Sequence, residues 1–351
     1  MSYPVSVCMI AKNEEKYIQE CLEHLKPYDM EIIVVDTGST DRTKEIARKY
    51  TDKVYDFAWI HDFSAARNFC AQKASNDWIL VIDCDEYIEK LDRNLLSVHM
   101  KKHSKSAGKI RIRNIARRNN GEVTYVDEEI TRFYHRGFYH FAYPVHENIV
   151  PIKEITGQET SISVPIEVIH HGYNIDAEAM KAKQERNLKL LYKALENTNT
   201  RNAYTYFQIG QSEQVLGNYN RAIESYHKCL EQKEDSNLQY MNTCVVQLAT
   251  AYAQIDEPQK AVEIMEAYRG KWKNARFVYA YALSLLGVEE FLKALMQFVV
   301  VSTLPDRESL GDDLGYCYQC IIKLYTMFGE KQMASDFQRR YEEYQKEKGT
   351  L

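Results

Sequence analysis

The sequence has no stretch that would place the chain in a membrane or mark it for export. No uninterrupted apolar run approaches the ~20 residues that a membrane-spanning helix needs. The N-terminus has no positively charged segment and its apolar run breaks at Lys12, so no signal peptide is expected. The eight cysteines are scattered through core-like segments and are expected to be reduced thiols. We therefore expect a cytoplasmic protein without a membrane span.

The sequence also lacks the marks of several nucleotide- and nucleic-acid-binding classes. Its 45 Lys and Arg stand against 50 Asp and Glu, so a formal net charge of −5 offers no basic footprint for nucleic acid. It contains neither a Walker A glycine loop nor a G-x-G-x-x-G turn. Cys317 and Cys320 form a CxxC without a second pair, a spacing that favours packing on one helix face over a metal or redox site. No nucleic-acid partner is expected.

The first part of the chain alternates short apolar runs with helical patterns. Residues 5–11, 31–36, 54–57 and 78–83 are predicted strands, and helical patterns follow the first three of them. Continuous apolar strands that alternate with helices predict a parallel sheet covered on both faces. The fold class is therefore α/β.

After about Leu91 the pattern changes. Residues 109–118 and 122–126 are predicted strands, and the Asn119-Asn120-Gly121 stretch between them is a hairpin signal. We interpret this region as an antiparallel extension that completes the first domain near Tyr173. The first domain is predicted to span residues 1–175.

Residues 176–351 are predicted to form an all-α domain of tetratricopeptide-like repeats. Small residues recur where paired helices would touch, at irregular intervals around the ~34-residue period of such repeats. These positions are Gly210, Ala222, Ala261, Ala294 and Ala334. Such an array either only shields a core, or offers a concave surface to an acceptor or to a second copy of the chain.

Acidic residues follow two of the predicted strands, at the point where each strand ends. Asp83 and Asp85 follow the fourth strand, and ligands of open parallel sheets bind beyond the carboxyl ends of strands. Paired carboxylates suit Mg²⁺ or Mn²⁺ held jointly with substrate phosphates. Asp36 ends the second strand, where it could accept hydrogen bonds from a nucleobase or ribose. By itself each pattern also fits turn capping, and Ser39 and Thr40 are expected to cap the helix after Asp36.

Further polar residues are expected at the same edge of the sheet. Asn13 and Glu14 follow the first strand, and Arg67 begins the helix after the third strand, where a guanidinium could grip a diphosphate. The alternative for Arg67 is a solvated helix face, which its apolar neighbours disfavour.

Four motifs in this order resemble the nucleotide-sugar-binding half of family-two glycosyltransferases, which have the GT-A fold. They are VSVCMIAKNEE, EIIVVDTGSTDRT, SAARN and DCDE. The resemblance implies a UDP-sugar donor, with Asp36 facing the uracil, Arg67 the diphosphate and Asp83 the ribose or metal-bound waters. Asp85 would ligate the divalent cation directly. The donor-binding set implied by the resemblance is Ala11, Asn13, Glu14, Asp36, Arg67, Asp83 and Cys84, although the Cys84 side chain is expected to turn back toward the sheet.

The resemblance continues into TRFYHRGFYHFAYPVHENI and EVIHHGYN, which look like the tetratricopeptide-bearing subgroup of that family. This subgroup includes the sublancin-type enzymes that glycosylate Cys or Ser of bacteriocin peptides. It implies His170 as a further metal or diphosphate ligand, beside Asp85 and Asp83, and Glu147 as the acceptor-side base. His171 is expected to pack in the fold. Other carboxylates stay open as the base: Asp62, Glu86, Asp127 and Glu128.

The predicted function is metal-dependent, inverting transfer of a hexose, glucose favoured, from a UDP-sugar to Cys or Ser of a peptide or protein. The expected partners are the UDP-sugar and a polypeptide acceptor, with a homodimer through the helical repeats as a further option. One alternative is a cell-envelope glycan or lipid-linked acceptor. Others are a non-catalytic adaptor with a degenerate transferase domain, and a phosphatase that uses Asp83 as nucleophile.

Overall fold

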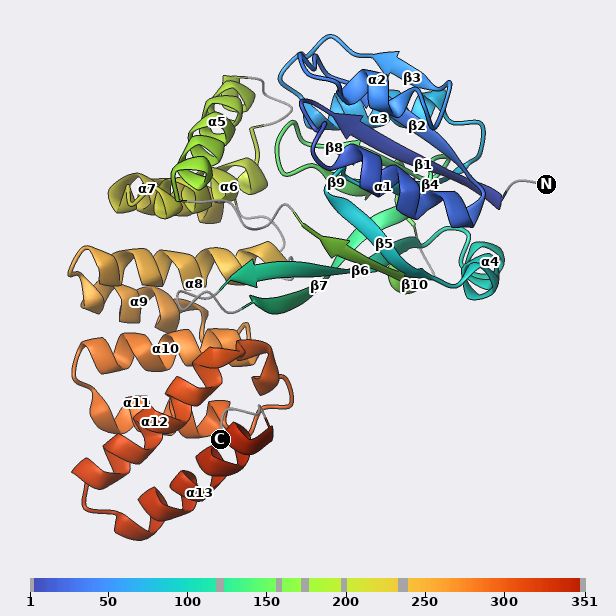
Figure 1. Ribbon diagram of the computed structural model, residues 1–351. Helices are drawn as coiled ribbons and strands as arrows, with labels where there is room; N and C mark the ends of the chain where they lie inside the picture. Colours follow the sequence, from blue (N-terminus) through green and yellow to red (C-terminus); the bar gives the residue numbers. More distant parts are fainter. Residues whose placement is uncertain are drawn as a thin grey trace. The chain divides into compact units, whose positions relative to one another are not determined.

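A computed structural model describes residues 3–117, 123–155, 160–171, 177–196, 201–232 and 239–347 (Figure 1). The chain divides into two compact units, Met1–Lys183 and Gln184–Leu351, and each is described by itself. The division that the sequence predicts at 175/176, and the domain end near Tyr173, fall at residues 172–176, outside the described residues.

The first unit is built on an eight-stranded sheet with the order β3-β2-β1-β4-β7-β6-β10-β5. Its first half consists of β1 (Tyr3–Ala11), β2 (Met30–Asp36), β3 (Val54–Asp56) and β4 (Trp78–Val81), which pair in parallel. The predicted parallel sheet is therefore confirmed, although β4 ends two residues before Asp83.

The second half of the sheet is the extension, with β5 (Glu86–Leu91), β6 (Ala107–Arg117), β7 (Val123–His135) and β10 (Ser161–His170). β7 runs antiparallel to β4 and β6, as predicted, but β10 runs parallel to β6. The extension is thus mixed, since the chain returns to β6 through two further strands, β8 (Tyr139–Ala142) and β9 (Asn148–Pro151). These two form a small sheet of their own. The Asn119-Asn120-Gly121 turn lies outside the described residues.

Apolar residues on alternate sides of β1 divide the core of this unit into two layers. Val5, Val7 and Met9 share one layer with buried residues of α1 (Ile18–Leu25), α2 (Thr43–Ala47) and α4 (Arg93–Lys102). Cys8 lies in the other layer, with α3 (Phe63–Lys73) and β8. A short 3₁₀ helix, η1 (Lys26–Tyr28), links α1 to β2. Both faces of the parallel half are therefore covered, and the polar strand ends are left at its edge.

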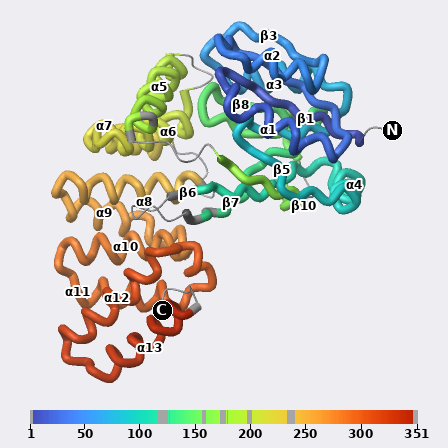
Figure 2. Tube along the Cα trace, in the orientation of Figure 1, coloured from blue at the N-terminus to red at the C-terminus, as the bar shows by residue number. Residues whose placement is uncertain are grey.

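The second unit consists of helices that stack in chain order (Figures 1 and 2). α5 (Ala177–Glu196) spans the division and leads into four described pairs. The pairs are α6 (Ala203–Val215) with α7 (Tyr219–Glu231), α8 (Gln239–Gln254) with α9 (Pro258–Tyr268), α10 (Ala275–Gly287) with α11 (Phe291–Val301), and α12 (Asp312–Met327) with α13 (Lys331–Glu347). The 3₁₀ helix η2 (Arg307–Leu310) precedes α12.

Small residues let the paired helices approach, as the sequence predicts. Ala222, Ala261 and Ala294 lie fully buried in the second helix of successive pairs. Gly210 on α6 faces the ring of Tyr226 on α7, and a Cβ there would lie 2.4 Å from its Cε1 atom. The predicted helical repeats are therefore confirmed.

The cysteines belong to the core of both units. All eight lie within the described residues, are free and are buried, including the CxxC pair on α12. Among the described residues no helix is long and apolar enough to cross a membrane.

Candidate active site

The acidic motif after β4 forms a tight turn from Asp83 to Glu86. The Glu86 backbone N–H donates to the Asp83 carbonyl oxygen at 3.0 Å, and the Asp83 backbone N–H donates to Glu86 Oε2 at 2.9 Å. Cys84 turns its side chain into the core, 3.9 Å from the Ile10 carbonyl oxygen, and is 3% exposed. Asp83 and Asp85 are thereby left at the end of the strand.

Asp83 is held by two arginines. Arg67 Nη2 donates to Oδ1 at 2.9 Å, and Arg132 Nη2 donates to Oδ2 at 2.9 Å. Burial alone would raise the pKa of Asp83, but the guanidinium groups of Arg132 and Arg67 outweigh it and hold that pKa well below its usual range. Both oxygens of this carboxylate therefore already have cationic partners.

Arg67 joins the donor-side motif to the predicted base. Its Nε donates to Glu147 Oε1 at 2.7 Å, and its guanidinium lies 5.5 Å from the centre of the Phe141 ring. The residue is 6% exposed, which excludes the solvated helix face. Its Nη1 is buried and has no hydrogen-bond partner among the described residues, so the two N–H bonds of this nitrogen are unsatisfied.

Helix α3 anchors the segment that carries Glu147. The Asn68 amide donates to the Phe141 carbonyl oxygen at 2.8 Å and accepts from its N–H at 2.9 Å, as a neighbouring strand would. The Phe63 N–H donates to the Pro144 carbonyl oxygen at 2.9 Å. These contacts explain how a residue 80 positions away in the sequence reaches Arg67.

Asp85 and His170 form the second part of the site. Asp85 Oδ2 lies 3.2 Å from His170 Nε2, and the Asp85 carbonyl oxygen accepts from the His171 N–H at 2.9 Å. His170 Nδ1 lies 2.8 Å from Asn114 Oδ1, while the Asn114 amide nitrogen donates to Glu128 at 2.6 Å. The Asn114 contact directs Nε2 at Asp85, and once Nε2 gives up its proton this nitrogen could ligate a metal.

The titration of nearby groups reflects this concentration of carboxylates. Burial would lower the pKa of His170, but the hydrogen bond to Asp85 and the charges of Asp85 and Glu86 raise it. Burial, with Asp85 and Asp83 nearby, raises the pKa of Glu14 to about 7. The site is thus electrostatically suited to a cation. Among the described residues, however, no group of three His, Cys, Asp or Glu side chains is arranged to hold a metal ion by itself.

The end of β2 is organised by hydrogen bonds between loops. The Asp36 carboxylate accepts from the N–H groups of Gly38 (Oδ1, 3.1 Å) and Ser39 (2.8 Å to Oδ1 and 3.0 Å to Oδ2). Asp36 is 2% exposed, and Gly38 supplies the positive φ of 106° that the turn needs. Ala11 ends β1 beside it, and its carbonyl oxygen accepts from the Thr37 N–H at 2.9 Å.

Ser39 and Thr40 do not cap α2, contrary to the prediction. The Ser39 hydroxyl accepts from the Asn13 N–H at 2.9 Å, and Asn13 Oδ1 accepts from the Thr40 N–H at 2.8 Å. Arg42 is the N-cap residue of α2 and its side chain makes no capping bond, while Asp41 accepts from the Thr43 N–H at 3.0 Å. The sequence pattern was misleading because the loop after β1 competes for the same polar side chains.

The remaining acidic candidates have partners of their own. Asp62 caps α3 by accepting from the Ala65 N–H, and Asp127 pairs with Arg113 at 2.9 Å. Glu128 accepts from Asn114. His171 stacks on Tyr87, with ring centres 4.3 Å apart, which agrees with its predicted packing role.

Sequence reasoning missed Arg132 and Asn114. Both lie inside extension strands, and no turn or strand end marks them in the sequence. The only available signal was their polarity at positions that an alternating strand pattern would bury.

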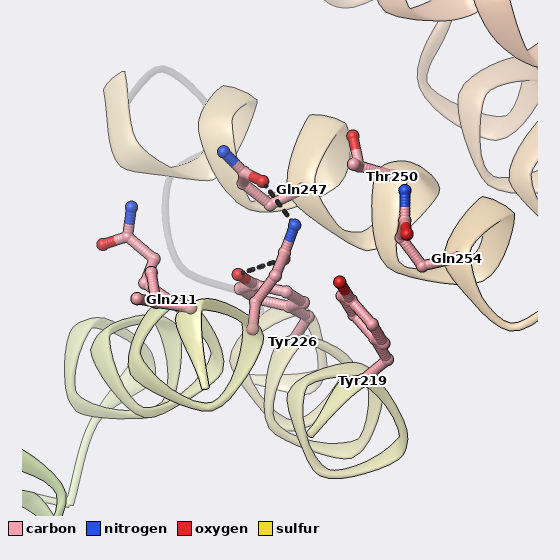
Figure 3. Close-up of a pocket in the computed structure, with 8 residues that line it drawn as sticks. Gln211, Tyr219, Tyr226, Gln247, Thr250 and Gln254 are labelled. Atoms are coloured by element: carbon pink, nitrogen blue, oxygen red, sulfur yellow. Dashed lines mark hydrogen bonds between the residues drawn. The ribbon is translucent and has the colours of Figure 1, made fainter. Parts of the chain in front are cut away.

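A second candidate site is a pocket of about 270 Å³ in the helical unit (Figure 3). None of its lining residues is charged, and all but Val215 are polar. They are Gln211, Gln214, Val215, Tyr219, Tyr226, Gln247, Thr250 and Gln254. Gln214 bonds to two other lining residues, since it accepts from the Tyr226 hydroxyl and donates to Gln247, both at 2.9 Å.

Parts of the chain are similar to known proteins. Residues 6–151 match the family model described as Glycosyl transferase family 2. The SPbeta prophage-derived glycosyltransferase SunS of Bacillus subtilis is 26% identical over 247 residues, which are 66% of this chain and 56% of that protein. The lipopolysaccharide core biosynthesis glycosyltransferase LpsC of Rhizobium meliloti is 33% identical over 97 residues, 26% of this chain and 36% of that protein.

A TPR repeat-containing protein of Synechococcus elongatus is 48% identical over 82 residues, which are 23% of this chain and 20% of that protein. This chain thus spans about half, or less, of the length of these relatives. Among solved structures, Staphylococcus aureus TarS gives a TM-score of 0.42 at 15% identity, over 76% of this chain and 55% of that chain. MamA gives 0.41 at 21% identity, over 50% and 96%. Residues 6–151 of this chain are therefore similar to glycosyl transferase family 2, and paired, tetratricopeptide-like helices follow them.

Proposed function

We propose that this chain transfers a hexose, glucose favoured, from a UDP-sugar to a Cys or Ser side chain of a peptide or protein. The observation that carries the proposal is the shared arginine: within a family-two domain, Arg67 contacts both Asp83 of the acidic turn and Glu147. One guanidinium would therefore contact both the donor-binding turn and the proposed base. The identity to SunS, whose name describes a glycosyltransferase, supports the same reaction class.

The donor would lie across the ends of β1, β2 and β4. Asp36 holds the turn at Gly38 and Ser39, and this turn with Ala11 and Asn13 would receive the uracil. Arg67, which is buried and has an unpartnered Nη1, would bind the diphosphate. Glu14 and Cys84 would border this region from the first loop and the acidic turn.

Asp85 and His170 are the residues that fit a divalent cation. They offer one carboxylate and one imidazole nitrogen 3.2 Å apart, and Mg²⁺ or Mn²⁺ commonly completes its coordination with substrate phosphates and water. Asp83 has both oxygens bonded to arginines, so we assign it to the ribose or to metal-bound waters. When bound, the cation would stabilise the charge that develops on the diphosphate.

Glu147 would act as the base. A donor diphosphate that binds Arg67 would weaken the Arg67–Glu147 ion pair. The Glu147 carboxylate could then accept the acceptor's proton. The acceptor sulfur or oxygen would form a bond to the sugar C1 as the bond from C1 to the diphosphate oxygen breaks, and UDP would leave. One displacement inverts the configuration at C1. A thiol needs the least help from the base.

The pocket in the helical unit would hold part of a polypeptide acceptor. Its glutamines each offer hydrogen-bond donors and acceptors, which suit the neutral groups of a peptide backbone, and the absence of charge in its lining disfavours an ionic ligand. A cell-envelope glycan acceptor is the second candidate, because the similar LpsC is named for lipopolysaccharide core biosynthesis. A cytoplasmic location and a homodimer through the helical repeats complete the proposal, and sedimentation would measure the latter.

Intact-mass measurement tests the reaction directly. The protein is incubated with Mn²⁺, a panel of UDP-sugars, and peptides that contain Cys or Ser, with Cys→Ala and Ser→Ala peptides as controls. One hexose added per acceptor peptide is expected. Calorimetry with UDP, with and without Mn²⁺, separates an enzyme from an adaptor. Metal-dependent binding without any transfer would redirect the search to glycan acceptors, and absence of UDP binding would favour the adaptor.

A further inference from the structure

The acidic turn is tied at both ends by groups that the proposed reaction does not use. Besides the backbone bond from Glu86 to Asp83, the buried Glu86 carboxylate accepts the Asp83 N–H through Oε2. This reciprocal pair closes a four-residue turn with Asp85 in its middle. The direction of Asp85 therefore depends on how firmly the two ends are held.

Arg132 reaches this turn from β7 and bonds both of its terminal carboxylates with one nitrogen. Nη2 lies 2.9 Å from Asp83 Oδ2 and 3.2 Å from Glu86 Oε1. The Glu86 and Arg132 side chains are only 3% and 14% exposed. In the sheet β7 lies beside β4, whereas β5 is at the far edge, so the arginine joins the turn to a strand that is not next to β5.

A buried ion pair of this kind contributes little net free energy to folding. Desolvation of the two charges often cancels their attraction, and apolar residues of similar size commonly serve as well. Arg132 Nε is also buried without a partner among the described residues. Stability alone thus gives a poor account of these two residues.

We infer that Arg132 and Glu86 are positioning residues that lock the Asp83–Glu86 turn and so hold Asp83 and Asp85 in place for the donor. Arg132 acts through Asp83, whose other oxygen is bonded to Arg67. Glu86 acts through the Asp83 N–H. The expected effect on donor binding rests on the proposed function, whereas the expected effect on the conformation of the turn does not.

Three variants test the lock. Arg132→Met removes the cation and leaves Glu86 buried without its partner, which threatens folding. The double variant Arg132→Met with Glu86→Gln removes both charges together and keeps an amide oxygen for the Asp83 N–H. Arg113→Met is the control, because Arg113 on β6 also pairs with carboxylates, but with Asp127 and Glu89, which lie outside residues 83–86.

The first measurement is hydrogen exchange of the ligand-free protein over residues 82–87. Loss of a charged hydrogen bond of ordinary strength predicts exchange in the double variant at least about tenfold faster than in the wild type. Arg113→Met should exchange at the wild-type rate. If a folded double variant exchanges at the wild-type rate, Arg132 and Glu86 do not hold the turn in place, whether or not the protein binds a nucleotide.

The second measurement is calorimetry with UDP and Mn²⁺. The double variant should regain most of the thermal stability that Arg132→Met loses, yet bind UDP about tenfold or more weakly than the wild type. Recovery of both stability and UDP affinity would mean that the pair is only structural. If the wild type itself binds no UDP, the proposed function fails, while the exchange result still shows whether Arg132 and Glu86 hold the turn in place.

Discussion

At the scale of single residues, two aspartates of one motif have different surroundings. Asp83 accepts from two largely buried guanidinium groups, whereas Asp85 contacts His170, although the two aspartate side chains are similarly exposed, 29% and 26%. The motif letters are symmetric, but the contacts are not. Substitution of Asp83 and of Asp85 should therefore affect different properties, stability in the first case and metal-dependent UDP binding in the second.

Asp85→Ala should abolish Mn²⁺-dependent UDP binding with little change in the midpoint of thermal unfolding. Asp83→Ala should lower that midpoint, because it removes the carboxylate that the largely buried guanidinium groups of Arg67 and Arg132 share. Calorimetry with UDP and a thermal melt of each variant measure both effects. Full transfer activity in Asp85→Ala would contradict the proposed reaction.

Glu147→Gln should keep Mn²⁺-dependent UDP binding but lose transfer, because the amide cannot take the acceptor's proton. General-base catalysis is typically worth about 10²–10⁴ in rate, so a loss of that size is expected in kcat for peptide modification. Asp62→Asn is the control, since Asp62 caps α3. Loss of activity in Asp62→Asn at unchanged stability would transfer the base role to that residue.

At the scale of elements, polar groups outside the site also fasten the sheet. Glu31 on β2 accepts from Ser6 on β1, from Lys53, and from the Ser75 N–H at 2.8 Å. Burial would raise its pKa, but the bonds from Lys53, Ser6 and Ser75 lower that pKa to about 2. The carboxylate thus links three segments of the parallel half.

This linkage predicts an acid-dependent loss of stability. A depressed folded-state pKa contributes stability above the ordinary Glu pKa, and that contribution is lost as the pH falls from about 4.5 through about 2. Glu31→Gln should lower the free energy of unfolding at pH 7 by about 2 kcal/mol and flatten its slope in that window. Urea unfolding at several pH values measures the change. An unaltered slope would mean that Glu31 is not a source of the acid sensitivity.

Close helix contact in the repeats gives a second prediction for elements. Gly210→Ala should destabilise the helical unit by about 1–3 kcal/mol, because the added Cβ meets the buried Tyr226 ring. Gly270→Ala is the control, since nothing lies within 4 Å of a Cβ built there. Urea unfolding compares the two. Equal effects would show that α6 and α7 can separate without cost.

At the scale of the whole molecule, the proposal separates donor binding from acceptor binding. Gln247→Ala with Gln254→Ala should raise KM for a peptide acceptor, because both residues line the pocket of the helical unit, and should leave UDP affinity unchanged. Gln338→Ala on α13 is a matched control outside the pocket's lining. Steady-state kinetics with an identified peptide measures the effect. Unchanged KM would place the acceptor elsewhere.

The sequence by itself determined the parallel half of the sheet and the helical repeats, and it pointed to the strand-end residues from Ala11 to Asp85 that we propose bind the donor. Apolar strands, helix periodicity and strand-end motifs are local patterns, so they are visible in consecutive letters. Arg67 was identified in the same way, through its motif and its apolar neighbours.

Only the tertiary structure decided which charges face one another. Arg132 and Glu86 lie 46 positions apart, and Asn114 and His170 lie 56 apart, and no local pattern relates either pair. Ser39 and Thr40 look like helix caps until the loop with Asn13 takes them. Long-range pairing depends on how strands β4, β5, β6, β7 and β10 are ordered in the sheet, and that order follows from the packing of the whole unit.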